Sequence, residues 1–335
     1  IEGHQQGADS LSMSILTPDQ REALVQRFDQ ALQFGSPLAR FTTARVGGPA
    51  EALITVRSGE ELAQAARTLW ELELEFRVLG GGSNVLVSDE GVEGVIILNR
   101  ARELRFMEQG QDLLAQAESG AVLGTVSRLA AERGWSGLEW AATVPGTVGG
   151  AVVGNAGAHG GDISDSIKVA EILQHNGQVE SWSETRLDFG YRTSALKASG
   201  QNYVVLSAAF ALERSTPDAC KQKIHAFSEQ RERTQPTGAS LGSMFKNPVD
   251  DYAGRLIEAA GLKGKQVGGV RISEKHANFF VNQGGGSATD VYKLISMAQA
   301  AVKQQFGVEL ELEIELLGDW EIELDQAKAW DGAGE

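Results

Sequence analysis

The sequence predicts a multidomain α+β protein, and three observations support this. Its 335 residues are 42% hydrophobic, which is enough to fill two or three separate cores. Residues 51–98 have the pattern of a βαβ-like unit, and residues 104–213 that of mostly short strands. After a Gln-Pro-Thr-Gly linker at 235–238, helices and strands mix again. We therefore expect five segments, which are a tag or disordered N-terminus at 1–16, units at 17–103, 104–215 and 216–318, and a tail at 319–335.

Composition and charge exclude several classes of function. The formal net charge is -15 and the isoelectric point is near 4.9, so phosphate backbones and anionic lipids are repelled. We expect no nucleic-acid and no membrane partner, although local backbone dipoles can still hold a small nucleotide. Cys220 is the only cysteine, which excludes an internal disulfide and a cysteine cluster that could hold zinc or iron-sulfur, and it fits a reducing compartment. No apolar run reaches about 18 residues and no leader is evident, so a cytoplasmic protein is expected.

The first unit is expected to contain two capped helices and four strands. Thr17, Pro18 and Gln20 form the start signal of a helix that runs to about Leu32. Ser58 with Glu61 forms a second capping box, and the apolar stripe after it predicts another helix. Apolar runs predict strands at 51–57, 76–79, 85–87 and 94–98.

The later units show a hairpin signal and further helices. Asn176-Gly177 between two apolar runs is typical of a tight β-hairpin turn. Helices are expected at 122–133, 217–233, 252–260 and 289–306, and strands at 279–281 and 308–317. In that last strand the residues Glu309, Glu311, Glu313 and Glu315 alternate with aliphatic residues, which places the carboxylates on one solvated face. The pattern alone does not choose which of them is functional.

Two glycine-rich segments are candidate ligand loops. Residues 80–84, Gly-Gly-Gly-Ser-Asn, end a strand, and their amides can form an anion site for a diphosphate. They match neither a Walker loop nor a Gly-x-Gly-x-x-Gly motif, so a tight turn is the alternative. Residues 144–161 are rich in glycine and poor in charge, which we interpret as a functional loop, with a structural omega-type loop as the alternative.

The heptad 242–248, Gly-Ser-Met-Phe-Lys-Asn-Pro, groups a hydroxyl, a cation and an amide. It lacks the Gly-x-Ser-x-Gly elbow of hydrolases, and no histidine or aspartate partner is evident in sequence. A serine hydrolase is therefore disfavoured, and a capping serine beside a surface lysine is the default interpretation of these residues alone.

Six segments in one order resemble the UDP-N-acetylenolpyruvoylglucosamine reductase family. They are residues 80–84, residues 138–160, Tyr191-Arg192-Thr193-Ser194, the heptad 242–248, residues 275–279 and residues 311–314, and the likeness covers about residues 35–318. Their joint occurrence is far more specific than any one of them. The resemblance implies an α+β FAD-binding fold of the vanillyl-alcohol-oxidase type, with FAD between two subdomains, 17–103 and 104–215, and a smaller α+β substrate-binding domain at 216–318.

The resemblance also implies non-covalently bound FAD, with NADPH as co-substrate. It places the FAD contacts on Gly80, Gly81, Gly82, Ser83, Asn84, Thr143, Pro145, Gly146, Gly149, Gly150, Asn155 and Ala158. Arg45 and Gly47 precede the first strand and are further candidates. His159 is either a flavin contact or an ordinary loop residue.

The implied reaction is the reduction of UDP-N-acetylglucosamine enolpyruvate to UDP-N-acetylmuramate, a step of peptidoglycan precursor synthesis. NADPH reduces the flavin, and the flavin then passes a hydride to the enolpyruvyl methylene carbon. Arg192 matches the arginine that stabilises the growing carboxylate charge, Glu313 the glutamate that partners the developing acid, and Ser243 the proton donor. The implied substrate contacts are Tyr191, Lys246 and Asn247, with Arg233, Gln235, His276 and Asn278 as weaker candidates.

Two residues depart from the family pattern near the implied glutamate. Glu315 stands where the family usually has a basic residue, and Leu312 replaces a proline. The charge balance beside Glu313 is therefore open. The short segment between Arg192 and Ser243 fits the form of the family without an extra tyrosine-bearing loop. We expect a monomer. The alternatives to the reductase function are an oxidase with the same cofactor fold and a non-enzymatic nucleotide-binding protein.

Overall fold

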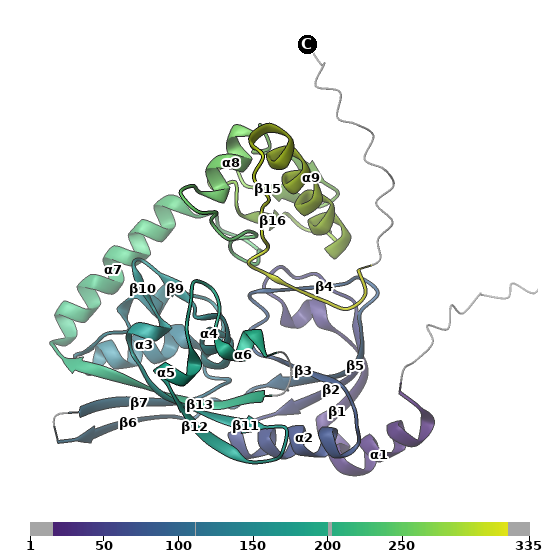
Figure 1. Cartoon of the computed structure of the whole chain (residues 1–335), viewed down its shortest axis with the longest axis vertical. Coiled ribbons are helices and arrows are strands. Elements are labelled where there is room, and N and C mark those ends of the chain that lie inside the picture. Colours follow the sequence, from purple (N-terminus) through teal and green to yellow (C-terminus); the bar gives the residue numbers. More distant parts are fainter. Residues whose placement is uncertain (1–15, 111, 200–202, 321–335) are drawn as a thin grey trace, which may run out of the picture.

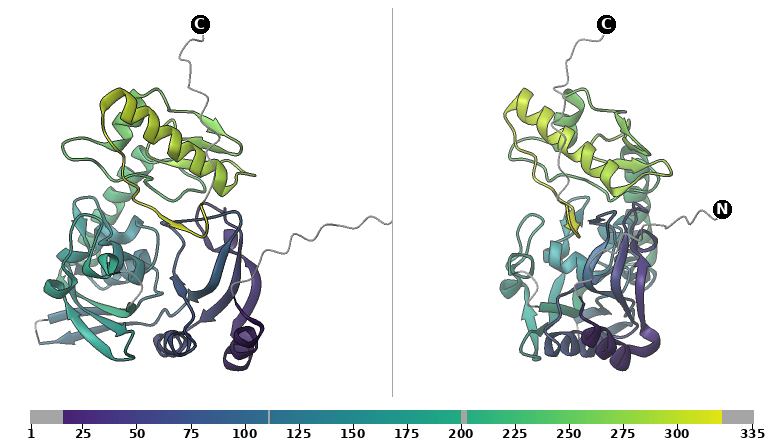
Figure 2. Two further views of the ribbon diagram at one scale, coloured as in Figure 1. Left: turned by 45° about the vertical axis from the view of Figure 1, so that its right-hand side comes forward. Right: turned by 90° about the vertical axis from the view of Figure 1, so that its right-hand side faces the viewer.

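The computed structural model describes residues 16–110, 112–199 and 203–320. In this part of the chain two units lie side by side, and a third lies over both of them after the long helix α7 (Pro217–Thr234), as Figures 1 and 2 show. The expected tag at 1–16 and the tail at 319–335 fall almost wholly outside the described residues. None of the described helices is long and apolar enough to cross a membrane.

The first unit is a four-stranded sheet with the strand order β1-β2-β5-β3. Its elements are α1 (Pro18–Phe28), β1 (Leu32–Pro37), β2 (Pro49–Val56), α2 (Gly59–Glu71), β3 (Phe76–Leu79), β4 (Val85–Val87) and β5 (Val92–Asn99). Both β2 and β3 run parallel to β5, which lies between them. The predicted βαβ-like unit of β2, α2 and β3 is thus confirmed, and β5 lies between its two strands.

The first helix begins where the sequence predicts and ends earlier. Thr17 and Gln20 form the reciprocal capping box. The helix ends at Phe28 instead of near Leu32, because a 3-10 turn follows and Leu32 already begins β1. The sequence does not predict β1, because Gly35, Ser36 and Pro37 are typical of turns; pairing with β2 makes the segment a strand.

The second capping box is only half formed. Ser58 Oγ accepts a hydrogen bond from the Glu61 amide at 3.1 Å, as expected of an N-cap. The Glu61 carboxylate instead accepts from the amide of Arg57 at 2.7 Å, so the return bond to Ser58 is absent. The helix that follows buries Leu62, Ala66 and Leu69 of its predicted stripe against the sheet.

The second unit is an antiparallel sheet with the order β12-β11-β13-β7-β6. Its strands are β6 (Leu104–Gln109), β7 (Asp112–Glu118), β8 (Trp135–Ser136), β11 (Ile167–Gln174), β12 (Val179–Ser183) and β13 (Tyr203–Arg214). Its helices are α3 (Leu123–Glu132), α4 (Val148–Gly154), α5 (Glu184–Leu187) and α6 (Ala195–Ala198). The hairpin at Asn176-Gly177 is confirmed between β11 and β12, with Gly177 at φ +80°.

The prediction of a continuous loop at 144–161 is wrong. Its middle forms α4, and its end forms the short hairpin of β9 (Gly157–Ala158) and β10 (Gly161–Asp162). Val148, Ala151 and Val152 follow the i, i+3, i+4 spacing of a helix face, and all three are buried in the core of the second unit. Burial of this stripe outweighs the low helix propensity of glycine.

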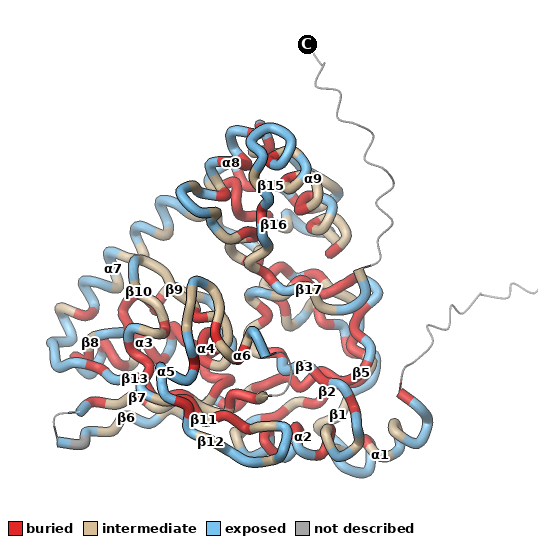
Figure 3. The backbone as a smooth tube through the Cα atoms, viewed as in Figure 1, coloured by how far each residue is buried: buried red, intermediate tan, exposed pale blue. Residues whose placement is uncertain are grey.

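The third unit contains α8 (Ala253–Ala259), α9 (Ala288–Phe306) and a sheet of β14 (Gln266–Val267), β15 (Val270–Ile272) and β16 (Phe280–Asn282). Buried residues form a core in each unit (Figure 3). The core of the third unit continues into the first through Ala44, Val46 and Leu86. The Asp89 carboxylate also accepts hydrogen bonds from the amides of Ala288 and Thr289, so it caps α9 from the first unit.

The strand expected at 308–317 is wrong for most of its length. Only β17 (Glu315–Leu317) forms, and it pairs in parallel with β4 of the first unit. Residues 308–314 cross between the units with one isolated bridge, between Leu312 and Phe245. The strict alternation of this segment reflects an extended chain with different neighbours at each residue, and not one regular strand.

Candidate active site

The two glycine-rich loops meet where the first and second units face each other. A Cβ atom on Gly81 would lie 2.9 Å from Gly146 Cα, and one on Gly80 would collide with the Thr147 hydroxyl. A Cβ on Gly82 would collide with the Phe41 carbonyl, and Gly82 has a left-handed φ of +59°. Glycine is therefore required here for packing of protein against protein.

A cavity of about 470 Å³ opens beside these loops and extends to the third unit. This volume lies in the usual range for ligand sites. The predicted residues that line it are Gly80, Gly81, Gly82, Ser83, Asn84, Pro145, Gly146, Gly149, Gly150, Ala158, Arg192, Ser243 and Glu313. Segments separated by more than 200 residues in sequence thus contribute to one site.

Unpaired amides give this cavity the character of an anion site. The backbone N–H groups of Gly81, Gly82 and Ser83 donate to no other group in the described part of the chain. All three residues line the cavity. Successive amides next to a residue with left-handed backbone form a concave donor surface that suits phosphate oxygens. The residues present therefore fit the diphosphate of the expected FAD.

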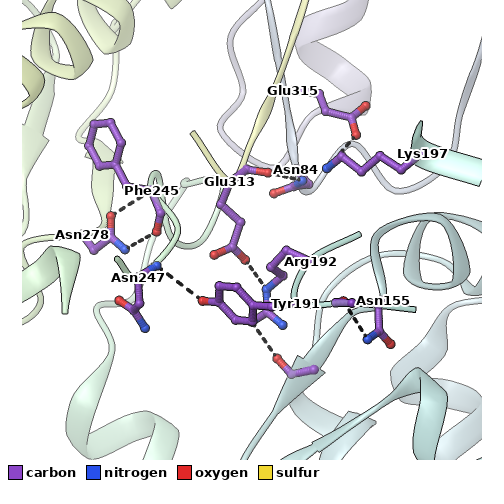
Figure 4. Close-up of polar contacts among 12 residues, drawn as sticks. Asn84, Asn155, Tyr191, Arg192, Lys197, Phe245, Asn247, Asn278, Glu313 and Glu315 are labelled. Atoms are coloured by element: carbon purple, nitrogen blue, oxygen red, sulfur yellow. Dashed lines mark hydrogen bonds and ion pairs between the residues drawn. The ribbon is translucent and has the colours of Figure 1, made fainter. Parts of the chain in front are cut away.

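Arg192 of the second unit and Ser243 and Glu313 of the third unit converge at the cavity, and Figure 4 shows Arg192 and Glu313. Arg192 Nε donates to Glu313 Oε1 at 2.8 Å, and Arg192 Nη2 donates to the Gly157 carbonyl at 3.0 Å. Both side chains are largely buried, with 25% and 18% of their surface exposed. Arg192 has a left-handed φ of +57°, a strained conformation that places its side chain on this side of the turn. Ser243 Oγ makes no hydrogen bond to another described residue, so it is free to serve a ligand.

Asn278 holds the backbone beside Ser243. Its side chain accepts from the Phe245 amide at 3.0 Å and donates to the Phe245 carbonyl at 2.8 Å. Its own carbonyl accepts from Met244 at 2.8 Å. Asn278 is only 3% exposed, and it does not line the cavity. We had considered it as a weak substrate contact; the structure makes it a support of the heptad.

Each of the four alternating glutamates has its own cation. Glu309 pairs with Lys303 at 2.6 Å, Glu311 with Lys246, Glu313 with Arg192 at 2.8 Å, and Glu315 with Lys197 at 3.3 Å. The pair of Glu309 lowers the pKa of that carboxyl, chiefly through the hydrogen bond from Lys303. Glu309, Glu311 and Glu315 are exposed, as expected, whereas Glu313 is largely buried. The expectation of a solvated carboxylate is therefore wrong for Glu313 alone. Lys197 also balances the charge of Glu315, because it supplies a basic group next to the position where the family usually has one.

The predicted substrate residues lie next to the cavity and do not line it. The Tyr191 hydroxyl accepts from the Asn247 amide at 3.4 Å, which joins the second unit to the third. The Asn247 side chain accepts from the Ala253 amide at 3.1 Å at the start of α8. Lys246 is held by Glu311. Tyr191 is exposed, so this group forms an outer rim beyond Arg192.

Two predicted cofactor residues also lie behind the cavity surface. Asn155 is buried and donates to the Gly190 carbonyl at 3.1 Å, which supports the turn that carries Arg192. Thr143 Oγ1 lies 3.3 Å from His159 Nε2, and the His159 ring stacks on Phe227 at 4.6 Å.

The other candidates are divided. Gln235 lines the cavity, whereas Arg233, Arg45 and Gly47 do not. His276 does not line it either, and its ring accepts from the Asn278 amide at 3.3 Å. Burial, and then the charge of Lys263, lower the pKa of His276.

Sequence reasoning missed several polar residues of the cavity. Asn99 and Ser119 are buried, line the cavity, and are joined by a hydrogen bond of 2.8 Å between the first and second units. Other missed polar or charged lining residues include Arg77, Thr147, Lys197, Tyr203 and Arg231. Asn99 ends β5 at the edge where Gly80 follows the parallel strand β3, and ligands bind at the carboxyl ends of parallel strands. That signal could have identified Asn99.

Comparison with known proteins decides the family. A family model described as "UDP-N-acetylenolpyruvoylglucosamine reductase, C-terminal domain" matches residues 234–317, and one described as "FAD binding domain" matches residues 50–183. The UDP-N-acetylenolpyruvoylglucosamine reductase of Chloroflexus aggregans is 41% identical over 289 residues, which are 85% of this chain and 97% of that protein. This chain belongs to the UDP-N-acetylenolpyruvoylglucosamine reductase family.

Further members of the family agree. The reductase of Rubrobacter xylanophilus is 41% identical over 298 residues, which are 89% of this chain and 99% of its own length. The crystal structure of the enzyme from Thermus caldophilus superposes with a TM-score of 0.71 at 35% identity, covering 84% of this chain and 97% of that one. The expected α+β FAD-binding fold with a further C-terminal domain is confirmed, and so is FAD as the cofactor.

Proposed function

We propose that this protein is the FAD-dependent oxidoreductase that converts UDP-N-acetylglucosamine enolpyruvate to UDP-N-acetylmuramate with NADPH. The observation that carries the proposal is the meeting of Arg192, Glu313 and Ser243 at the cavity that the two glycine loops border. Membership of the reductase family and the match to a FAD-binding domain also support it. We further propose that it acts as a monomer in the cytoplasm, in peptidoglycan precursor synthesis, with FAD-binding subdomains at 17–103 and 104–215 and a substrate domain at 216–318.

The first task of the protein is to bind the cofactor. We assign its diphosphate to the amides of Gly81, Gly82 and Ser83, with Gly80, Asn84 and the loop from Pro145 to Gly150 around it. Asn155, Thr143 and Ala158 complete or support this wall. When bound, FAD supplies hydride transfer between NADPH and the substrate.

The second task is to stabilise the charge that grows on the enolpyruvyl carboxylate. A planar guanidinium matches a carboxylate in shape and charge, and Arg192 presents one at the cavity. Glu313 holds Arg192 in place through their ion pair and partners the developing acid. Because both groups are largely buried before the substrate arrives, little reorganisation is needed during the reaction.

The third task is to protonate the carbon next to that carboxylate. Ser243 offers a hydroxyl that no other described residue uses, on a backbone fixed by Asn278. We assign the diphosphate of the substrate to the outer rim of Tyr191, Lys246 and Asn247. Lys246 would then exchange its contact with the exposed Glu311 for a phosphate oxygen.

The test separates the two half-reactions of the purified protein. The flavin absorbance should be bleached by NADPH without oxygen and should return when the enolpyruvyl UDP-sugar is added. Ser243→Ala should leave the bleaching unchanged and slow the return by about 10²–10⁴, the usual contribution of a general acid. A flavin that NADPH reduces but the UDP-sugar does not reoxidise would refute the proposed substrate, and loss of both steps in Ser243→Ala would refute the role of the serine.

A further inference from the structure

Arg100 is a half-buried cation directly after β5, and its charge is directed at a peptide group. Its Nη1 donates to the Gly80 carbonyl at 2.8 Å, and its guanidinium lies 5.9 Å from the Phe41 ring centre. Among the described residues it has no carboxylate partner, although the chain contains 45 acidic residues. Burial, and then the neighbouring charge of Arg102, lower the pKa of Arg100. A desolvated arginine whose hydrogen bonds to described residues go only to the peptide carbonyls of Gly80 and Asn99 needs an explanation other than an ion pair.

The explanation lies in the geometry of the peptide that Arg100 holds. In a planar trans peptide the C=O and N–H groups point in opposite directions. The Gly80 carbonyl points to Arg100, so the Gly81 N–H points away from it. Gly81 lines the cavity and Arg100 does not, so this N–H is directed to the cavity side of the loop.

Thr43 holds the Gly82 carbonyl, two residues further along the loop, in the same way. The Thr43 amide donates to the Gly82 carbonyl at 2.9 Å, which turns the Ser83 N–H to the opposite side. Thr43 Oγ1 also donates to the Ser240 carbonyl at 2.7 Å, so the same residue ties the loop to the third unit. Ser83 lines the cavity, whereas Thr43 does not. Two contacts from behind thus orient two alternate peptides of one loop.

A carbonyl oxygen turned toward a diphosphate would repel it, whereas an amide N–H attracts it. We propose that Arg100 is a positioning residue for the FAD diphosphate, which it serves by keeping the Gly80 carbonyl out of the cavity and the Gly81 amide in it, with Thr43 as its counterpart at Gly82. The inference rests on the cofactor site proposed above and adds a residue that does not touch the cofactor.

The experiment compares two arginines that make the same kind of contact. Arg67 Nε donates to the Gly177 carbonyl at 3.1 Å, in the hairpin between β11 and β12 and outside the cavity lining, so Arg67→Met is the matched control for Arg100→Met. FAD release from the full-length holoprotein is followed by flavin fluorescence on dilution, and the two diphosphate resonances of the bound cofactor are followed by phosphorus NMR. Thermal unfolding of each variant is recorded after the flavin has been removed.

We expect Arg100→Met to weaken FAD binding about tenfold, the effect of one charge-assisted hydrogen bond, and to shift at least one diphosphate resonance. Arg67→Met should change neither. Arg100→Lys should recover part of the affinity, and it decides the case if Arg100→Met does not fold. Unchanged FAD affinity and resonances in the Arg100 variants, or equal losses in Arg67→Met, would overturn the inference. Failure of the unmodified protein to bind FAD would instead overturn the cofactor site itself.

Discussion

Glu313→Gln tests the chemistry of the site with little change in its shape. The Glu313 backbone is held independently of its side chain, because its amide donates to the Met244 carbonyl at 2.9 Å and its carbonyl accepts from Asn84 Nδ2 at 3.0 Å. Arg192 also keeps its bond to the Gly157 carbonyl. The substitution therefore removes one negative charge from a contact of 2.8 Å and leaves the surrounding structure in place.

The expected loss follows from that contact. A hydrogen bond to a charged group contributes roughly 1.5–3 kcal/mol, and a residue that takes part in proton transfer accelerates a reaction by about 10²–10⁴. We expect substrate-dependent reoxidation of the flavin to slow by about 10²–10³, or about 3–4 kcal/mol of barrier. Reduction by NADPH should stay near the rate of the unmodified protein, since that step develops no carboxylate charge.

Stopped-flow absorbance of the flavin measures both steps in one preparation. Glu309→Gln is the control, because it removes the same charge four residues earlier, from an exposed pair with Lys303 at 2.6 Å. The control should leave both rates unchanged. If Glu313→Gln slowed only the reduction by NADPH, or if the control slowed reoxidation equally, the assignment of Glu313 would be wrong.

Two further predictions concern the supports of the fold. Asn278→Ala leaves the amide and carbonyl of the fully buried Phe245 without partners, which should lower the free energy of unfolding by about 2–4 kcal/mol; a thermal shift of the holoprotein no larger than that of a surface variant would contradict this. For the buried Glu139, burial acts to raise the pKa, but hydrogen bonds from Ser136 and Gly137 and the charge of Lys223 outweigh it and lower the pKa. The stability that its charge provides is therefore present above the ordinary pKa of 4.5 and is lost as the pH falls through the lower folded value. Denaturant unfolding should show Glu139→Gln less stable than the unmodified protein at pH 7, with a difference that shrinks below pH 4.5; a difference that grew on acidification would contradict the sign.

The sequence predicted correctly those elements that depend on neighbouring residues alone. The capping box at Thr17 and the Asn176-Gly177 turn are made by neighbouring residues, and both are confirmed. β1 has no such signal, and only its pairing with β2 makes it a strand. Residues 308–316 alternate perfectly in sequence, yet their neighbours come from all three units. The periodicity therefore predicted an extended chain but not its pairing.

The site was predicted through whole motifs more than through single residues. The resemblance brought together residues that line one cavity, including the three assigned to catalysis. It did not distinguish residues that line the cavity from those behind it, such as Asn155 and Asn278, because both kinds belong to the same motifs. Lys197 and Arg100 lie outside those motifs, and only distances in the folded chain reveal their partners.

The return of the chain from the third unit to β4 sets an order of assembly. Asn84, in the first glycine loop, holds Glu313 across 229 residues of sequence, and β17 pairs with β4 directly after it. During synthesis the loop residues Gly80 to Asn84 therefore emerge long before the carboxylate that orients Arg192. A nascent chain has both glycine loops for many seconds at ordinary rates of about 5–20 residues per second, while the proposed reaction centre is still incomplete. We therefore expect activity to appear only after β17 has been made and has paired with β4 of the first unit.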